Sequence, residues 1–238
     1  MKIAQILYDK GVNKKLFTRY AVREVMGLLI MAAALFIPAG RLDWPQAWAV
    51  LGIMLAWVAA TALVLLRIHP ALIAERLGPR QGSKGWDGAI MSAVGLLQLG
   101  RYILAGLDRR FAWSGFFPTG LQLGAFLVGV AGYALVLWAT ASNAFFSQIV
   151  RLQPERNQSV VSDGPYQWVR HPAYTGAILF ELAAPLLLES WPAFFVSLAT
   201  VFLLILRTYL EDHTLQSELA GYADYAGRVR YRLLPGLW

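Results

Sequence analysis

The residues best suited to chemistry gather in one polar segment, residues 162–176, which we call the Gly-Pro-Tyr segment and which lies between apolar runs. It reads Ser-Asp-Gly-Pro-Tyr-Gln-Trp-Val-Arg-His-Pro-Ala-Tyr-Thr-Gly. His171 offers an imidazole, and Tyr166 and Tyr174 offer phenols. Pro172 disfavours a helical conformation at His171, so we expect a helix to begin directly after it. An interfacial loop with aromatic anchors is one interpretation; a functional site at the mouth of a membrane helix is the other.

A second polar stretch begins after the last apolar run. Arg207 and Glu211 are four residues apart, so on a helix they share one face. As a surface ion pair they would contribute only about 0–1 kcal/mol. The apolar runs 173–188 and 193–206 predict a helical hairpin, however, which would return both residues to the membrane face that holds the Gly-Pro-Tyr segment. We therefore expect the two polar stretches to line one pocket.

The elements that must position these residues are membrane helices. Of the 238 residues, 58% are hydrophobic and 15% are charged, against about 25% charged in soluble domains. The composition predicts an all-α fold, a polytopic integral membrane protein with about six transmembrane helices. The expected spans are 22–39, 44–66, 88–107, 118–140, 173–188 and 193–206. We expect four N-terminal membrane helices in residues 1–140 and a catalytic region with the hairpin and a cytoplasmic tail in residues 141–238.

Two further features of these runs carry structural predictions. Residues 73–78 have an amphipathic pattern, which favours a short helix lying on the membrane surface. Gly120 and Gly124 form a small-xxx-small pair in the fourth span, which favours close packing against a neighbouring helix.

The distribution of positive charge predicts the orientation. The net charge is +7. With six spans, 17 of the 21 Lys and Arg residues fall on the side of the membrane that holds the N-terminus, three fall on the other side, and Arg101 lies within a span. Six of the 17 form a basic N-terminal arm, for which we expect a partly helical, interfacial structure. The positive-inside rule places both termini and the active site in the cytoplasm. Because the basic residues lie in the gaps between apolar runs, they indicate contact with membrane lipids and no nucleic acid partner.

Several chemistries are unsupported by the sequence. Cysteine is absent, which excludes disulfides, thiolate metal sites and a cysteine nucleophile. The three histidines are scattered, so no metal site is predicted. There is no Gly-x-Gly-x-x-Gly dinucleotide motif and no Gly-x-Ser-x-Gly elbow.

An ordered set of motifs over residues 143–235 resembles the isoprenylcysteine carboxyl methyltransferase family. In chain order the motifs are Asn143-Ala144-Phe145-Phe146, Gly164-Pro165-Tyr166, Val169-Arg170-His171-Pro172-Ala173-Tyr174-Thr175-Gly176, Arg207-Thr208, Glu211-Asp212 with Leu215, Gly221-Tyr222 with Tyr225, and Leu234-Pro235. The wider superfamily includes phospholipid N-methyltransferases, and some membrane sterol reductases have a related C-terminal half.

The resemblance implies use of S-adenosylmethionine (SAM). By position, the residues that fall where the family binds this cofactor are Gln153, Gln158, Ser159, Val160, Val161, Tyr166, His171, Pro172, Ala173, Tyr174 and Glu211. The match at Gln153 requires a gap. Arg207 matches a residue that the family assigns to the methyl acceptor, so it is both the catalytic and the substrate-binding candidate. Family members commonly have two glutamates where this chain has Glu211-Asp212, so the second position keeps its charge and has a shorter reach.

The residue types fit this chemistry. The carboxylate of Glu211 suits the ammonium of SAM, His171 and backbone N–H groups suit its carboxylate, and a tyrosine suits its sulfonium. An acceptor carboxylate, with a reference pKa of about 3.3–3.7, is already ionised at neutral pH and needs no general base. Arg207 could hold it bidentately. We therefore predict carboxyl O-methylation of a lipophilic acceptor, a prenylated cysteine by resemblance, which enters from the bilayer.

Three alternatives remain open. A methyltransferase acting on a lipid amine, such as a phospholipid N-methyltransferase, would need a base near the methyl group and would have little use for Arg207. An NADPH-dependent membrane reductase would need a basic phosphate site, for which only Arg151, Arg156 and Arg170 are available. A non-catalytic scaffold would bind no cofactor. Arg101, inside the third span, could line an acceptor tunnel, have a buried partner, or snorkel toward the membrane surface.

Overall fold

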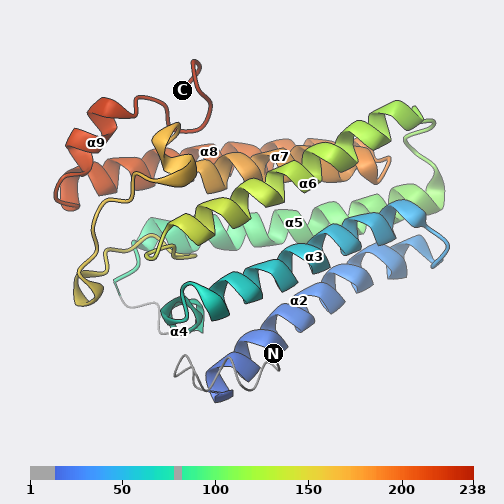
Figure 1. The fold of residues 1–238 in the computed structure, drawn as a ribbon. Helices are drawn as coiled ribbons and strands as arrows, with labels where there is room; N and C mark the ends of the chain where they lie inside the picture. The colour runs from blue at the N-terminus through green and yellow to red at the C-terminus, as the bar shows by residue number, and fades with distance from the viewer. Residues whose placement is uncertain (1–13, 78–81) are drawn as a thin grey trace.

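The computed structural model describes residues 14–77 and 82–238, and within these ranges it contains helices and loops and no strand (Figure 1). In chain order the helices are α2 (Lys14–Ala39), α3 (Pro45–Arg67), α4 (Ala71–Leu77), α5 (Gly85–Phe111), α6 (Thr119–Ser142), the 3₁₀ turns η1 (Pro154–Arg156) and η2 (Gly164–Gln167), α7 (Pro172–Leu187), α8 (Trp191–Glu218) and α9 (Tyr222–Arg228). The predicted all-α class is confirmed. The part of the basic arm in residues 1–13 lies outside the described ranges.

Five helices are long and apolar enough to cross a membrane, namely α2, α3, α5, α6 and α8. The sixth predicted span is α7, which has 16 residues and therefore a length of about 24 Å, less than the roughly 30 Å of a bilayer core. Helix α8 continues to Glu218, twelve residues past the predicted end of the apolar run at 206. The second polar stretch is therefore an extension of a membrane helix. The protein is an integral membrane protein, as the composition indicates.

The helices of the two predicted regions pack against each other. Helix α7 packs on α6, α8 packs on α5, and α5 also contacts α2. Figure 1 shows the long helices side by side, with α4, α9, the α6–α7 loop and the C-terminus gathered at one end of the bundle. The division at residue 140 stays a prediction. The short helix predicted over residues 73–78 is observed as α4, except that Gly78 lies outside the described residues. Its position on the membrane surface stays a prediction.

Helices α6 and α7 approach so closely that only glycine fits at their contact. A Cβ on Gly132 would lie 2.6 Å from the carbonyl oxygen of Gly176, and a Cβ on Gly176 would lie 2.3 Å from that of Gly132. The pair predicted for this role, Gly120 and Gly124, has no neighbouring atom within 4 Å of either Cβ position. That prediction was wrong because both residues lie on a face of α6 that this bundle leaves open. The close contact holds the start of α7, and with it the Gly-Pro-Tyr segment, against α6.

Candidate active site

The Gly-Pro-Tyr segment leads into α7 as the prolines predict. Helix α7 begins at Pro172, and His171 is its N-cap residue with φ −128° and ψ 60°. The backbone N–H groups of Arg170 and His171 donate to the carbonyl oxygens of Tyr231 and Arg232, each at 2.9 Å. The C-terminal tail therefore holds the backbone of the Gly-Pro-Tyr segment by two hydrogen bonds. The side chain of His171 is buried.

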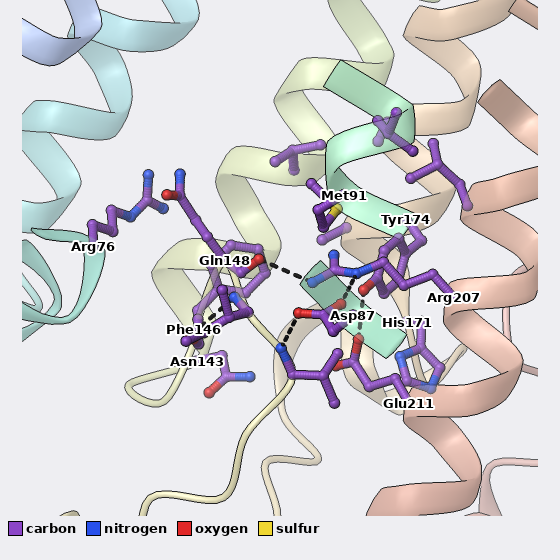
Figure 2. A pocket seen from close by; sticks show the side chains of 18 of the residues that line it. Arg76, Asp87, Met91, Asn143, Phe146, Gln148, His171, Tyr174, Arg207 and Glu211 are labelled. Atoms are coloured by element: carbon purple, nitrogen blue, oxygen red, sulfur yellow. Dashed lines mark hydrogen bonds and ion pairs between the residues drawn. The ribbon is translucent and has the colours of Figure 1, made fainter. Parts of the chain in front are cut away.

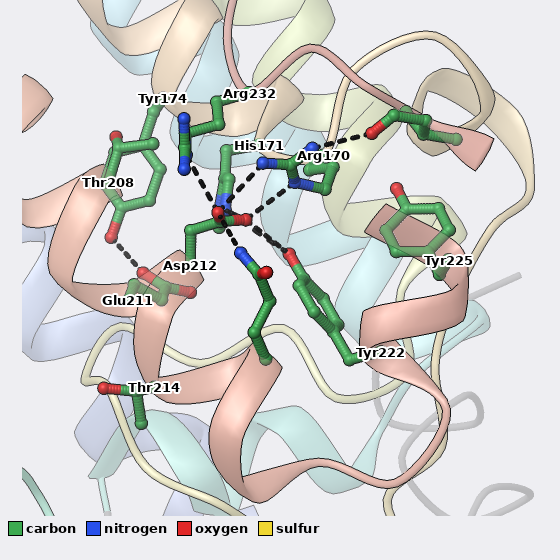
Figure 3. A network of polar contacts seen from close by, with 12 residues as sticks. Arg170, His171, Tyr174, Thr208, Glu211, Asp212, Thr214, Tyr222, Tyr225 and Arg232 are labelled. Carbon is green, nitrogen blue, oxygen red and sulfur yellow. Dashed lines mark hydrogen bonds and ion pairs between the residues drawn. The ribbon is translucent and has the colours of Figure 1, made fainter. Parts of the chain in front are cut away.

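Asp212 is the centre of the polar network drawn in Figure 3. Arg170 donates to its two oxygens from Nε at 2.7 Å and Nη2 at 2.9 Å, and Arg232 Nε donates to Oδ2 at 2.8 Å. The hydroxyl of Tyr222 donates to Oδ1 at 3.2 Å, and His171 Nε2 lies 3.2 Å from the same oxygen. Burial raises the pKa of the Tyr222 phenol, so it stays a donor. Asp212 thus joins α8, α9, the tail and the segment before α7. It is buried, and both of its carboxylate oxygens accept hydrogen bonds from these elements.

The carboxylate of Glu211 lies beside this network and has a different environment. The hydroxyl of Tyr174 on α7 donates to Glu211 Oε2, which links α7 to α8. Within the described part of the chain, no Lys, Arg or His lies within ion-pair distance of Glu211. The predicted convergence of the two polar stretches is therefore confirmed. Of the two neighbouring acids on α8, Asp212 is compensated by arginines and Glu211 is available to a cationic ligand.

Arg207 lies one turn before Glu211 and is held by residues that the sequence did not single out (Figure 2). Its Nε donates to Asp87 Oδ1 at 2.6 Å, and its Nη2 donates to the carbonyl oxygen of Gln148 at 2.9 Å. Asp87 Oδ2 also accepts from the backbone N–H of Val150 at 2.8 Å. The guanidinium carbon lies 5.4 Å from the centroid of the Tyr174 ring. Its Nη1 has no hydrogen-bond partner among the described residues, which leaves one donor group for a ligand.

One cavity of about 760 Å³ joins these groups to the apolar interior. Its polar end is lined by side chains of the α6–α7 loop, α7, α8 and α9. Its other walls come from α2, α3 and α5, and include Leu28, Met31, Met54, Trp57 and Met91. Arg207 lines the cavity and contacts both parts, because it packs on Tyr174 and pairs with Asp87 of α5.

Most of the residues predicted from the sequence line this cavity. These are Gln158, Ser159, Val160, Val161, Tyr166, His171, Ala173, Tyr174, Arg207 and Glu211. Gln153 and Pro172 do not line it. Gln153 is buried in the loop, where its Nε2 donates to the Phe145 carbonyl at 2.8 Å and its Oε1 accepts from Arg156 Nη1 at 2.6 Å. Pro172 opens the first turn of α7. The structure therefore gives both residues a structural role in shaping the loop and the helix start.

A buried polar cluster lines the cavity among the membrane helices. The guanidinium of Arg101 is paired with the carboxylate of Glu181 on α7, and its Nη2 donates to the Tyr102 hydroxyl at 2.8 Å. Gln98 Nε2 donates to the other oxygen of Glu181 at 2.7 Å. Arg101 is 1% exposed. The interpretation that Arg101 has a buried partner is confirmed. Arg101 also lines the cavity, and the use of this cavity by an acceptor stays a prediction.

The fold and the site define a class of protein: an integral membrane protein whose C-terminal hairpin and tail enclose the polar end of a cavity that continues among the membrane helices. Residues 123–217 match the model of the isoprenylcysteine carboxyl methyltransferase (ICMT) family. The resemblance to this family of methyltransferases is thus confirmed over these residues. Asp87 lies outside the matched residues, so the family motifs could not have pointed to it.

The fold is also similar to that of a solved relative, described as the eukaryotic intramembrane Ras methyltransferase ICMT. The match covers 86% of this chain and 74% of the other, with a TM-score of 0.50 and 18% sequence identity. It shows a common fold that includes helices before the family match. No curated protein matches the sequence.

Proposed function

We propose that the protein is a SAM-dependent membrane methyltransferase that esterifies the carboxylate of a lipophilic acceptor, with a prenylated cysteine as the first candidate. The observation that carries this proposal is the single cavity in which the uncompensated carboxylate of Glu211, the guanidinium of Arg207 and an apolar wall meet. The family match supports the reaction class, because residues 123–217 include the whole hairpin.

The polar end of the cavity fits a cofactor with a positive charge. Glu211 is half-buried and has no ion-pair partner in the described part of the chain, and a carboxylate in that environment favours a cationic ligand. Tyr166, Tyr174 and Tyr222 line the same end, and aromatic rings attract a sulfonium or an ammonium. When bound, SAM supplies a methyl group on sulfur that is transferred as a cation equivalent. His171 and the backbone of residues 158–161 would hold its polar groups.

Arg207 positions the acceptor. The acceptor carboxylate is ionised near neutral pH, so its oxygen would form the bond to the methyl carbon of a bound SAM, and the electron pair of the broken carbon–sulfur bond would stay on sulfur. The product is a neutral ester, no proton moves, and no general base is needed. Asp87 and the Gln148 carbonyl fix the plane of the Arg207 guanidinium, which leaves Nη1 to orient the carboxylate. The apolar walls keep water from competing as a nucleophile.

Cofactor binding by the purified protein in detergent tests the proposal first. We expect SAM to bind and NADPH not to bind. Glu211→Gln should weaken SAM binding at least tenfold, because it removes the anion, whereas Glu218→Gln on the exposed end of the same helix should leave SAM affinity within twofold. Binding of NADPH without SAM would favour a membrane reductase and contradict the proposal.

The kind of bond formed in the product tests the second part of the proposal, that the methyl group is transferred to a carboxylate. With labelled SAM and an N-acetylated farnesylcysteine, we expect label in a methyl ester that mild base releases as methanol. With phosphatidylethanolamine in place of the acid, we expect no transfer. Base-stable label on the amine lipid would instead indicate an N-methyltransferase.

We further propose that both termini and the polar end of the cavity face the cytoplasm, which the distribution of Lys and Arg supports. The chain has no cysteine, so single introduced cysteines report sidedness without background. A cysteine at Asp224 on α9 should react with an impermeant maleimide only in inverted vesicles. A cysteine at Arg41, in the α2–α3 turn, should react in intact cells, and the reverse pattern would overturn the orientation.

A further inference from the structure

Six arginines line the cavity, and one of them has no acid beside it. The six are Arg23, Arg76, Arg101, Arg151, Arg170 and Arg207. Five of them are ion-paired within the chain. The pairs are Arg23–Glu24, Arg101–Glu181, Arg151–Glu75, Arg170–Asp212 and Arg207–Asp87. No carboxylate of the described residues lies within ion-pair distance of Arg76.

Arg76 is nevertheless buried. It lies in the last turn of α4 and is 8% exposed. Its Nε has no hydrogen-bond partner, its guanidinium carbon lies 6.0 Å from the centroid of the Phe146 ring, and its polar neighbour is the Tyr20 hydroxyl. Burial lowers the pKa of Arg76, because the charged form loses hydration and the charges of Tyr20 and Glu24 compensate that loss only in part. A guanidinium that is buried without an anion destabilises the protein unless a ligand provides the anion.

The position of Arg76 in the cavity separates it from Arg207. Gln148 lies between them in Figure 2. Its carbonyl oxygen accepts from Arg207, while its Oε1 accepts from Arg23 Nη1 at 3.3 Å, and the same Nη1 donates to the Arg76 carbonyl oxygen at 2.7 Å. Arg76 and Arg207 therefore lie on opposite sides of Gln148, and of these two only Arg207 has a carboxylate partner.

We propose that Arg76 binds an oxyanion, a carboxylate or a phosphate, in addition to the carboxylate held at Arg207. If the acceptor carries this oxyanion, Arg76 selects acceptors that have a second acidic group. The balance of charges in the cavity supports this assignment. Glu211 is the unpaired anion and suits a cationic cofactor, and Arg76 is the unpaired cation and suits an anionic group of the second ligand. The selection of acceptors rests on the proposed function; oxyanion binding at Arg76 does not. The oxyanion has two sources, the acceptor itself or the headgroup of a membrane lipid.

A matched pair of amphiphiles tests the first source. N-palmitoyl-glutamate and N-palmitoyl-glutamine have the same shape, but only the former has a second carboxylate. We expect the wild-type protein in a non-ionic detergent to bind the glutamate compound about tenfold to a hundredfold more tightly, as one charge-assisted hydrogen-bonded pair predicts. The ratio should fall to about one in Arg76→Gln, stay well above one in Arg76→Lys, and be unchanged in Arg110→Gln, an exposed arginine at the far end of α5.

Nanodiscs test the second source. If the oxyanion is a lipid headgroup, phosphatidylglycerol should raise the Tm of the wild-type protein above its value in phosphatidylcholine, and Arg76→Gln should abolish that increment. Loss of either effect with Arg76→Gln supports the proposal and names the source. If every effect seen in the wild type survives in Arg76→Gln, or if the wild type shows neither effect, the proposal is overturned. SAM affinity, measured on every variant, shows that the variant is folded and separates this result from a failure of the proposed function.

Discussion

Replacing Asp87 with asparagine keeps the shape of this side chain and removes its charge. Asp87 is 1% exposed and accepts two hydrogen bonds, one from Arg207 Nε at 2.6 Å and one from the Val150 N–H at 2.8 Å. An asparagine has one oxygen and one NH₂ group, so it can satisfy only one of the two donors. The other donor, either the guanidinium or the loop amide, is left without its partner.

The size of the effect follows from these contacts. A hydrogen bond to a charged group contributes about 1.5–3 kcal/mol, which corresponds to a factor of roughly 10 to 150 in an equilibrium or rate constant. Because the side chain of Asp87 bonds to Arg207 and the Val150 N–H and not to Glu211, this loss should fall on the acceptor. We expect kcat/KM for a farnesylcysteine acid to fall by that factor and the Kd for SAM to change less than threefold.

Steady-state kinetics with varied acceptor, together with calorimetric titration of SAM, separate the two effects. Asp108→Asn is the matched control. Asp108 is also a buried acid on α5, but its Oδ1 accepts from the Ser114 N–H at 2.9 Å at the other end of the helix. We expect this variant to keep the wild-type kcat/KM. An equal loss of SAM affinity and acceptor turnover in Asp87→Asn, or an equal loss of turnover in both variants, would refute the role given to Asp87.

Three further predictions concern stability. Gly176→Ala should lower the free energy of unfolding by at least about 1–3 kcal/mol, because its Cβ would clash with the carbonyl of Gly132; Gly120→Ala, on the open face, should change it little, and equal effects would contradict the packing. Glu181→Leu should cost about 3–5 kcal/mol by stranding the buried Arg101, and adding Arg101→Met should recover much of that loss; no recovery would argue against a direct coupling. Hydrogen bonds from Arg151 lower the pKa of Glu75, so the stability that this carboxylate contributes is present above its unfolded pKa of about 4.3 and is lost as the pH falls through the lower folded value. Thermal unfolding of wild type and Glu75→Gln should therefore differ at pH 7 and converge in acid, and a constant difference would contradict the assignment.

The membrane fold could be predicted because it depends on local properties. Runs of apolar residues fix the spans, and Pro172 fixes the start of α7. The hairpin then brings Tyr174 to Glu211 with no further information. These features could be predicted because each depends on residues that lie close together in the sequence.

The partners of the charged residues could not be predicted, because they come from distant parts of the chain. Asp87 is 120 residues from Arg207, and an acid in the first turn of a helix is equally well explained by the helix dipole. The sequence could not show which of the neighbouring acids Glu211 and Asp212 pairs with arginine. The arginines that bond to Asp212 lie on the Gly-Pro-Tyr segment and the tail, far from it in the sequence.

A structure determined with S-adenosylhomocysteine bound tests the central claim most directly. The account predicts that the ligand lies in the cavity against residues 158–161, with its ammonium within about 3.2 Å of a Glu211 oxygen, and with its sulfur directed toward Arg207. A ligand bound outside this cavity, or in it with Glu211 left without a cationic partner, would contradict the account.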